Sequence, residues 1–541
     1  MNQEAKQKTI QIIDELKSTC QAFGLGNDGN EYKIITQVFL YKFVNDKFSY
    51  EIKKLNKNLA TSVKWEDEYS KMSEDERQNL LDQLSPDFAR LEPHHLLTSL
   101  WNQKQKEDFA TIFDKTMIEI AQKNSGIFST QTSLNTKVPI FEKLTIYIPD
   151  DGERSNFARA LIDKLVNFSF EDAFTQHYDF FAYIFEYLIK DYNTNGGGKY
   201  AEYYTPHAIA SIMAKLLVGD KKNYHSVEIY DPSAGTGTLL MALSHQIGEK
   251  KCAIFAQDIS QRSNKMLKLN LILNGLISSL KNIIQGDTLT NPYHMSGDNL
   301  KTFDFVVSNP PFKMDFSETR EKIATMLNRF KDGVPTVPAK KKESMPIYTL
   351  FIQHVINSLK KDIGKGAIVV PTGFITAKSG VENKILKRIV DEKIVYGCVS
   401  MPSNVFANTG TNVSVLFFDK SKNHDEVILI DASKLGEDYR DGKNKKRRLT
   451  KDNIDLIINT FNKKESVDEL SVVVSYDEIK EKNYSLSAGQ YFDIKIEYID
   501  MAPEEFEAKM NEYKQELQDY FAEGEKLQKE IMEQLEKVKY E

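Results

Sequence analysis

The sequence predicts an α/β fold, with a Rossmann-like, doubly wound parallel sheet that follows a helical domain and precedes a long helix. Three observations carry this prediction. Short apolar runs alternate with helix-like segments between residues 227 and 418. A glycine-rich turn, Asp231 to Thr238, follows the first of these runs. The last segment, residues 503–541, repeats apolar side chains at helical spacing.

Composition shifts and motif positions divide the chain into four predicted segments. Residues 1–165 show helical apolar periodicity and no catalytic motif, which indicates an interaction domain or a lid domain. Residues 166–422 contain the alternating strands and helices. Residues 423–500 are a small mixed segment, and residues 501–541 form one amphipathic helix. The chemistry is therefore expected in the second segment.

The first segment offers one pair of potential metal ligands, His94 and His95. Because adjacent residues cannot share one face of a helix, surface or capping roles are favoured over metal binding. No other cluster with metal-ligand spacing was found in the sequence, so no metal site is predicted.

The second segment predicts strands and helices in strict alternation. Its strands are expected at 227–230, 252–257, 282–285, 303–307, 367–370, 393–399 and 413–418. Its helices are expected at 209–218, 239–247, 263–276 and 348–359. Thr205 is expected to cap the first of these helices, with Pro206 at its first position.

Charge and cysteine usage limit the classes of function. The 541 residues carry a formal net charge of −7, and 12 acidic residues against 6 lysines lie in the segment 503–541. The basic clusters Lys340–Lys342 and Lys443–Arg448 are more typical of solvated loops than of phosphate contacts. No apolar run suits a membrane span, no signal-peptide core is found, and three scattered cysteines favour a reducing cytoplasm.

The turn after the first strand is a candidate ligand loop. Its glycines let backbone approach a ligand closely, and the following helix supplies free N–H groups. It is neither a dinucleotide G-x-G-x-x-G, since Leu240 stands at the third glycine, nor a P-loop. Asp231, Asp258 and Asp287 each end a successive predicted strand. Each alone is more often a loop cap, but together they suit an ammonium group, a ribose and an adenine, the three groups of S-adenosylmethionine.

The stretch Ser308 to Phe312, Ser-Asn-Pro-Pro-Phe, follows the fourth strand of the segment. Ligands of open α/β sheets bind at the carboxyl ends of strands. Asn309 offers an amide acceptor, Pro310 a backbone carbonyl, and Phe312 a flat ring. This set suits an exocyclic amine on a planar base, although a Pro-rich turn after a core strand is the simpler alternative for the stretch alone.

The order of these motifs resembles a known enzyme family. Tyr-Thr-Pro at 204–206, Asp-Pro-x-x-Gly-Thr-Gly at 231–237, Asp258 and Asn-Pro-Pro-Phe at 309–312 follow one another as in gamma-group DNA methyltransferases that act on adenine N6. The larger layout resembles the modification (M) subunit of a Type I restriction-modification system. The motif-bearing match covers about residues 195–420, and Asp258 stands where the family usually has Glu.

The resemblance implies a function, a cofactor and partners. It implies methyl transfer from S-adenosylmethionine to a flipped adenine in double-stranded DNA, with sequence recognition by a separate specificity (S) subunit. It implies two M subunits per S subunit, with a restriction (R) subunit as a further candidate partner. The implied catalytic and base-stacking residues are Asn309, Pro310, Pro311, Phe312 and Phe406. The candidate cofactor-binding residues are Tyr203, Tyr204, Thr205, Pro206, Asp231, Ser233, Gly235, Thr236, Gly237, Thr238, Asp258 and Asp287.

Three alternatives stay open on the sequence. Asn-Pro-Pro-aromatic motifs also occur in enzymes that methylate a protein glutamine or an RNA guanine amine. A stand-alone adenine methyltransferase is a second alternative, although residues 423–500 are few for a target-recognition domain. A third is a scaffold subunit that binds cofactor without catalysis, which the intact motif at 309–312 disfavours.

Overall fold

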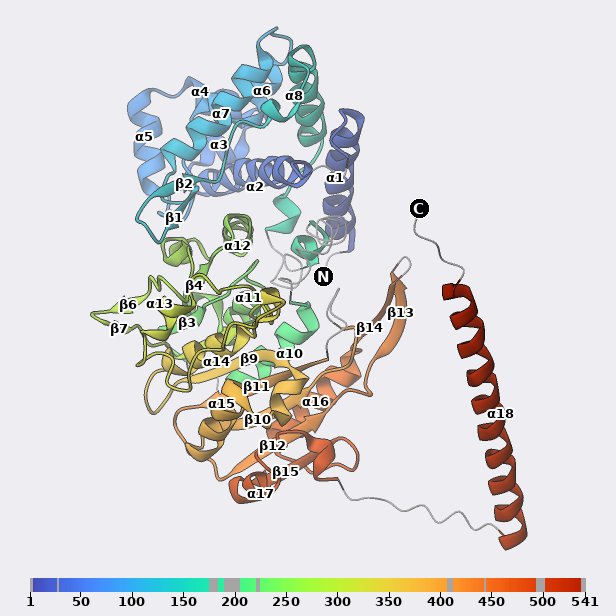
Figure 1. The fold of residues 1–541 in the computed structure, drawn as a ribbon. Helices are drawn as coiled ribbons and strands as arrows, with labels where there is room; N and C mark the ends of the chain where they lie inside the picture. The colour runs from blue at the N-terminus through green and yellow to red at the C-terminus, as the bar shows by residue number, and fades with distance from the viewer. Residues whose placement is uncertain are drawn as a thin grey trace. The chain divides into compact units, whose positions relative to one another are not determined.

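The computed structural model describes residues 3–26, 29–174, 183–188, 205–219, 224–405, 412–441, 444–492 and 502–536. It divides the chain into two compact units, Met1–Tyr491 and Phe492–Glu541 (Figure 1). The first unit contains a helical region and a large sheet. The second unit contains one helix.

The helical region is held together by apolar faces that its helices bury against one another. α8 packs against α1, α6 and α7, and α2 buries residues on every side of its middle turns. Its helices are α1 (Gln3–Ala22), α2 (Glu31–Leu55), α3 (Lys57–Thr61), α4 (Trp65–Lys71), α5 (Glu74–Gln83), α6 (Leu97–Gln103), α7 (Phe109–Lys123) and α8 (Asp151–Val166). The prediction of a mainly helical start is confirmed for the described part of this region.

One sheet of 11 strands organises the first unit, in the order β15-β12-β10-β11-β9-β8-β3-β4-β5-β1-β2. Its central strands are almost wholly buried, as expected for a sheet that helices cover on both faces. The strands are β1 (Ser129–Thr132), β2 (Lys137–Pro139), β3 (Val227–Asp231), β4 (Cys252–Asp258), β5 (Ile283–Gln285), β8 (Phe305–Ser308), β9 (Lys365–Pro371), β10 (Val395–Ser400), β11 (Val413–Asp419), β12 (Glu426–Asp431) and β15 (Ser471–Ser475).

The sheet is mixed, so the prediction of a wholly parallel sheet is wrong at one of its predicted strands. β5, β4, β3, β8 and β9 pair in parallel, but β11 lies antiparallel between β9 and β10. β10 and β11 pair as direct neighbours, with Ser400 opposite Ser414. The 12 residues between β10 and β11 lie at the lower limit of what a parallel crossover needs, so the length of the connection does not decide the direction of β11.

Strands from outside the central segment complete the sheet at both edges. β1 pairs in parallel with β5 and carries β2 as an antiparallel edge strand. At the other edge, β12 pairs with β10 and β15 pairs with β12. Two small ribbons stand apart from this sheet: β6 (Met295–Ser296) with β7 (Asn299–Leu300), and β13 (Glu437–Asp441) with β14 (Asn444–Arg448).

The helices that follow the strands pack against the sheet (Figure 1). α11 contacts β3 and β4, α12 contacts β4 and β5, and α14 contacts β8 and β9. These helices are α10 (His207–Val218), α11 (Thr238–Ile247), α12 (Gln261–Leu273), α13 (Arg320–Ala324), α14 (Tyr348–Asn357), α15 (Gly380–Asp391), α16 (Lys451–Lys463) and α17 (Tyr476–Glu481). The predicted ends of the strands and helices between residues 207 and 419 agree with the structure to within about three residues.

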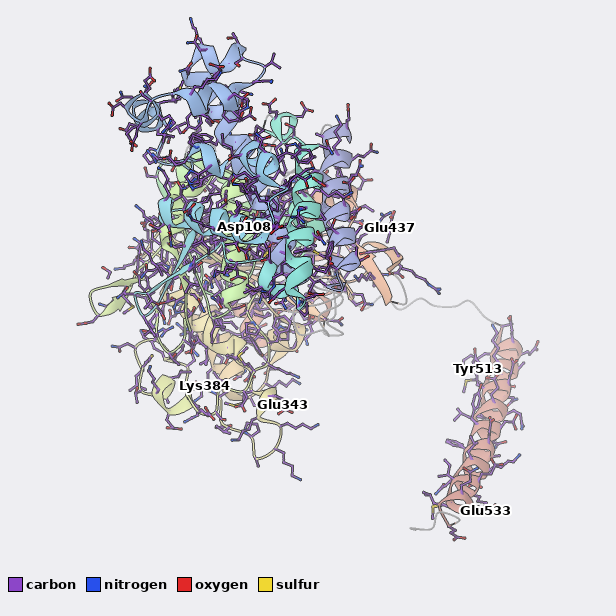
Figure 2. All side chains as sticks on the ribbon, turned by 90° about the horizontal axis from the view of Figure 1, so that it is seen from above. Asp108, Glu343, Lys384, Glu437, Tyr513 and Glu533 are labelled. Atoms are coloured by element: carbon purple, nitrogen blue, oxygen red, sulfur yellow. The ribbon has the colours of Figure 1, made fainter. Side chains whose placement is uncertain are left out.

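The second unit is the single helix α18 (Pro503–Glu536), about 50 Å long at the usual rise per residue. Every one of its residues is exposed, including the apolar stripe of Phe506, Met510, Tyr513 and Leu517. Figure 2 shows its side chains extending from the helix, with Tyr513 and Glu533 labelled. Among all helices built from described residues, none combines the length and apolar character that a membrane span requires.

Candidate active site

The candidate site lies where four neighbouring parallel strands end. The order β8-β3-β4-β5 brings together Asn309, Asp231, Asp258 and Asp287, which end or directly follow these strands. Parallel strands present their carboxyl ends at one edge, which is where open α/β sheets bind ligands. Residues spread over about 80 positions of sequence are therefore neighbours along this edge of the sheet.

The glycine-rich turn is built around backbone angles that favour glycine. Gly235 and Gly237 have φ values of +52° and +84°. A Cβ atom on Gly237 would lie 2.1 Å from Cδ1 of Leu267 on α12, so this glycine is also required by packing. The Gly235 N–H donates to Oδ2 of Asp258 at 2.9 Å, and the Ser260 N–H donates to Oδ1 at 2.8 Å. These bonds fix the Asp258 carboxylate beside the turn.

Asp231 is a buried acid at the end of β3, only 1% exposed. Its Oδ1 accepts from the Ser233 N–H at 2.9 Å. Burial above all, with the neighbouring Asp258 charge adding to it, raises the pKa of Asp231 to about 8. Within the described residues, no ion pair is formed by Asp231, Asp258 or Asp287. A buried carboxylate without a cationic partner suits a ligand that brings its own ammonium group.

Asp287 shapes the turn that follows β5. Its Oδ1 accepts from the Leu289 N–H at 2.9 Å, and its Oδ2 accepts from the Thr290 hydroxyl at 2.6 Å. The Thr288 hydroxyl donates to the Pro232 carbonyl at 2.7 Å. The turn that carries Asp287 is therefore tied directly to the glycine-rich turn.

Asn309 lies over the same small space as the glycine-rich turn. Its Nδ2 donates to Oγ1 of Thr205 at 3.0 Å, which leaves Oδ1 as the other end of a fixed amide. The preceding Ser308 hydroxyl lies 2.6 Å from the Ser233 hydroxyl, which joins the two loops. A cavity of about 10 Å³, room for about one water, is lined by Thr205, Asp231, Ser233, Ala234, Thr236, Thr238, Leu239 and Asn309.

The predicted role of Thr205 as a helix cap is wrong. α10 begins at His207 with Pro206 at the capping position, and Pro206 makes no side-chain capping bond. The Thr205 hydroxyl accepts from Asn309 instead, because the chain brings it to the strand end before the helix starts. Thr205 therefore belongs to the site through a contact that its sequence neighbours did not indicate.

Of the aromatic residues predicted to stack on a base, only Phe312 lies in the described part of the chain. It is half-buried, and its ring meets that of Tyr348 edge to face at 6.3 Å and 79°. Phe406, Tyr203 and Tyr204 lie outside the described residues. Phe312 is therefore the predicted stacking residue whose surroundings the structure describes.

The sequence did not indicate several polar residues that hold the loops of the site in place. Ser308 and Thr288 join neighbouring loops, and the buried pair Arg329 and His354 contacts the turn after β5. Only Ser308 could have been found from sequence, because it adjoins the Asn-Pro-Pro-Phe motif. The others depend on contacts between residues far apart in the chain.

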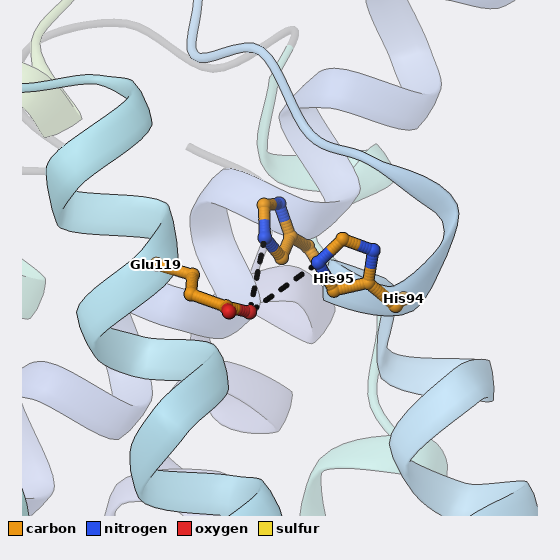
Figure 3. A group of neighbouring side chains, drawn as sticks. All are labelled: His94, His95 and Glu119. Carbon is orange, nitrogen blue, oxygen red and sulfur yellow. Dashed lines mark ion pairs between the residues drawn. The ribbon is translucent and has the colours of Figure 1, made fainter. Parts of the chain in front are cut away.

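Within the histidine pair of the helical region, His95 does not have the tautomer that a metal ligand needs. His94, in the 3₁₀ helix η1 (Pro93–His95), has its Nε2 3.3 Å from Oε2 of Glu119, and Nε2 of His95 lies 3.9 Å from the same oxygen (Figure 3). The Glu92 N–H donates to Nδ1 of His95 at 3.1 Å, so neutral His95 carries its hydrogen on Nε2. A metal on Nε2 would require the opposite tautomer, with two N–H groups facing each other at Nδ1.

Comparisons with known proteins agree with the motif order. Residues 176–498 match the family model described as N-6 DNA Methylase. The chain is 30% identical over 327 residues to the Type I restriction enzyme MpnII methylase subunit of Mycoplasma pneumoniae, which covers 59% of this chain and 58% of that protein. It is 28% identical to the MjaIX methylase subunit of Methanocaldococcus jannaschii, over 66% of this chain and 63% of that one. The match therefore spans less than two thirds of either relative.

The fold is shared with a solved structure of similar size. The type I restriction-modification system methyltransferase subunit from Streptococcus thermophilus superposes with a TM-score of 0.73 at 21% identity, covering 91% of this chain and 99% of that one. This likeness confirms the predicted fold class, with its sheet of mostly parallel strands, helical start and final helix. The family resemblance drawn from the motifs is confirmed by the match over residues 176–498.

Proposed function

Because this chain belongs to the N-6 DNA Methylase family, we propose that it is the methylating subunit of a Type I restriction-modification enzyme and modifies adenine N6 in double-stranded DNA. One observation carries the proposal. Asn309 and the glycine-rich turn line the same small cavity, and the amide of Asn309 is held with its oxygen end free of donors from described residues.

The cofactor proposed for this site is S-adenosylmethionine, which supplies an electrophilic methyl group when bound. The residues fit it: Asp231 would hold the ammonium group, Asp258 the ribose hydroxyls and Asp287 the adenine amine. The fit rests on three carboxylates at successive strand ends that form no ion pair within the described residues. Asp231 in particular gains from a cation, since its burial disfavours a lone negative charge.

The target amine is activated by two acceptors of this chain. The nitrogen lone pair of adenine N6 is delocalised into the ring, which makes it a poor nucleophile. Oδ1 of Asn309 and the carbonyl of Pro310 would accept the two N6 hydrogens and so favour a tetrahedral nitrogen with a localised lone pair. No described residue donates to either oxygen, so both acceptors are available. The step needs positioning and electrostatic stabilisation, with no covalent intermediate on the protein.

The target base must leave the duplex to reach acceptors at a strand end. Extrusion costs a few kcal/mol of stacking and pairing energy. The face of Phe312, beside Asn309, would offset part of that cost, and Phe406 is proposed to add to it. Pro311 keeps Phe312 close to the acceptors, because proline fixes φ and stiffens the loop between them.

Sequence recognition is proposed to come from a separate specificity subunit, with two copies of this chain for each copy of that subunit. A restriction subunit would complete the enzyme. α18 is proposed as the docking helix, because the side chains of its apolar stripe are exposed on the helix. The net charge of −7 also predicts weak binding of free DNA at physiological salt.

The test begins with purification of the full chain from its native host and identification of the chain that accompanies it. The complex is incubated with isotopically labelled S-adenosylmethionine and DNA, and the product nucleosides are analysed by mass spectrometry. We expect label in N6-methyladenine at one defined sequence, and only with the partner present. Label in glutamine or in RNA guanine, or cofactor binding without transfer, would replace the proposal by the corresponding alternative. Site-specific methylation by the chain alone would show that no specificity subunit is needed.

A further inference from the structure

A buried arginine lies beneath the turn that carries Asp287. Arg329 follows α13, in the segment between Phe312 and α14, and is only 8% exposed. Its Nη1 donates to the Leu289 carbonyl at 2.7 Å, and its Nη2 donates to the Thr288 carbonyl at 2.6 Å. Within the described residues Arg329 forms no ion pair with an acid. Its charge is therefore met by backbone carbonyls, and the Asp287 carboxylate attracts it without forming an ion pair.

The two carbonyls belong to the residues directly after Asp287. The same Leu289 donates its N–H to Asp287, and the same Thr288 donates its hydroxyl to Pro232 of the glycine-rich turn. Arg329 thus holds the same two residues through their carbonyl groups. The position of the Asp287 carboxylate is set by a turn that Arg329 clamps.

The other edge of the guanidinium reaches the strand that carries Asp231. Nη2 of Arg329 lies 2.9 Å from Nδ1 of His354 on α14, and Nε2 of His354 lies 3.2 Å from the Tyr230 hydroxyl. Since arginine only donates, Nδ1 of His354 accepts and its Nε2 carries the hydrogen. Tyr230 immediately precedes Asp231 on β3. One guanidinium therefore connects the two strand ends proposed to hold the two ends of the cofactor.

Burying an arginine that forms no ion pair costs free energy, so its position here calls for a physical explanation. Arginine presents five donors in a rigid planar fork, and here that fork meets two carbonyls and one imidazole at once. No other side chain could supply these directions from one position. The arrangement suits a residue whose role is to hold backbone in place.

We propose that Arg329 is the positioning residue for the adenosine end of the cofactor: it holds the turn after β5 so that the Asp287 carboxylate meets the 6-amino group of the adenine. Arg329 does not touch the cofactor itself. The identity of the ligand rests on the proposed function.

The test compares two ligands that differ only at the group Asp287 is proposed to contact. S-adenosylhomocysteine carries the 6-amino group, and S-inosylhomocysteine carries an oxygen in its place. Their affinities are measured by calorimetry on the full-length chain and on the variants Arg329→Gln and Arg329→Lys. We expect the wild type to prefer the amino ligand. Arg329→Gln should weaken its binding about 10- to 100-fold, the range for charge-assisted hydrogen bonds, and should bring the ratio of the two affinities close to one.

Arg329→Lys keeps the charge but not the fork, so its loss should be smaller and in the same direction. Steady-state kinetics on the partner complex should show KM for S-adenosylmethionine raised with kcat changed less than about threefold, since uniform binding alone is lost. If Arg329→Gln does not fold, the ratio of the two ligand affinities in Arg329→Lys decides the question.

The matched control is Arg388→Gln. Arg388 is another largely buried arginine near this segment, but within the described residues it pairs with Asp332 at 2.7 Å and not with the turn after β5. It should lower the melting temperature without altering the ligand ratio. An unchanged ratio in the Arg329 variants, or an equal change in Arg388→Gln, overturns the inference. If the wild-type chain binds both ligands equally, Asp287 does not contact the 6-amino group and Arg329 does not have the proposed role. If it binds neither ligand, the proposed function is contradicted.

Discussion

The two units of the chain use apolar side chains in opposite ways. In Met1–Tyr491 the strands β9 and β11 bury apolar residues almost completely, and the loops at the ends of β3, β5 and β8 are tied together by hydrogen bonds. In α18, Phe506, Tyr513 and Leu517 remain 57%, 56% and 53% exposed. The described core of the first unit is closely packed, whereas the second unit presents an exposed apolar stripe on a single helix. This contrast underlies the proposal that one chain supplies the chemical site and that α18 docks on a partner.

The largest effect on the comparison is expected when the proposed hydrogen-bond acceptor of the first unit, the Asn309 amide, is removed. Asn309→Ala should lower kcat of the partner complex about 100- to 1,000-fold, the size of effect seen when one preorganised group at a reacting centre is lost. Cofactor affinity and partner binding should stay within about threefold, because neither depends on this amide. Single-turnover methylation and calorimetry measure the two quantities. Near-normal transfer would show that Asn309 is structural.

The second unit is tested by placing charge in its stripe. Tyr513→Glu with Leu517→Glu should weaken partner binding by at least about 30-fold, since burying two charges in an apolar contact is unfavourable. Cofactor binding should be unchanged. Asn511→Glu with Gln518→Glu adds the same charge away from the stripe and should leave assembly intact. Both pairs are compared by co-purification and by titration against the specificity subunit. Equal losses in the two pairs would mean that net charge, not the stripe, governs assembly.

A smaller effect is expected from the ribose contact. Asp258→Ala should weaken S-adenosylmethionine binding by about 1–3 kcal/mol, the range for a hydrogen bond to a charged group. The loss includes the bonds from Gly235 and Ser260 that hold the turn. Asp425→Ala, which removes an exposed acid paired with Lys393, is the control and should bind normally. Unchanged calorimetric affinity in Asp258→Ala would exclude the role.

The last prediction concerns pH. Because burial raises the pKa of Asp231 to about 8, its carboxyl is protonated below that pH when no cation is bound. A ligand ammonium favours the ionised form, so cofactor affinity should rise up to about tenfold per pH unit from pH 6 to 8 and level off above. Asp231→Asn should bind more weakly and lose this slope. Calorimetry in buffers of different ionisation enthalpy measures the proton released. A flat profile for the wild type would contradict the assignment.

The strand ends could be predicted because local pattern and global fold agree there. Apolar runs that stop at Asp231, Asp258 and Ser308 locate the ends of β3, β4 and β8, and the parallel sheet then brings those ends together. The direction of β11 could not be predicted from its own residues, since a fully buried strand reads the same in either direction.

The role of Arg329 could not be predicted from the sequence, for a different reason. Its partners are carbonyls 40 and 41 residues earlier in the chain, and backbone acceptors have no signature in sequence. The segment between Phe312 and Tyr348 also lacks the periodicity that would have placed it. The docking of β1 and β2 on β5 escaped prediction likewise, because two short edge strands resemble loops.

The bond between Asn309 and Thr205 has a consequence for which bases the site accepts. An amide is nearly symmetric in shape, so only its hydrogen-bond partners decide whether oxygen or nitrogen faces the target. The Thr205 hydroxyl, 104 residues upstream, takes the nitrogen end. Two oxygens, those of Asn309 and Pro310, then face the substrate, and a base with a carbonyl at the same place would meet them with its own lone pairs. On the proposed function, discrimination against oxo bases is thus a matter of electrostatic repulsion between the oxygen of the base and the oxygens of Asn309 and Pro310.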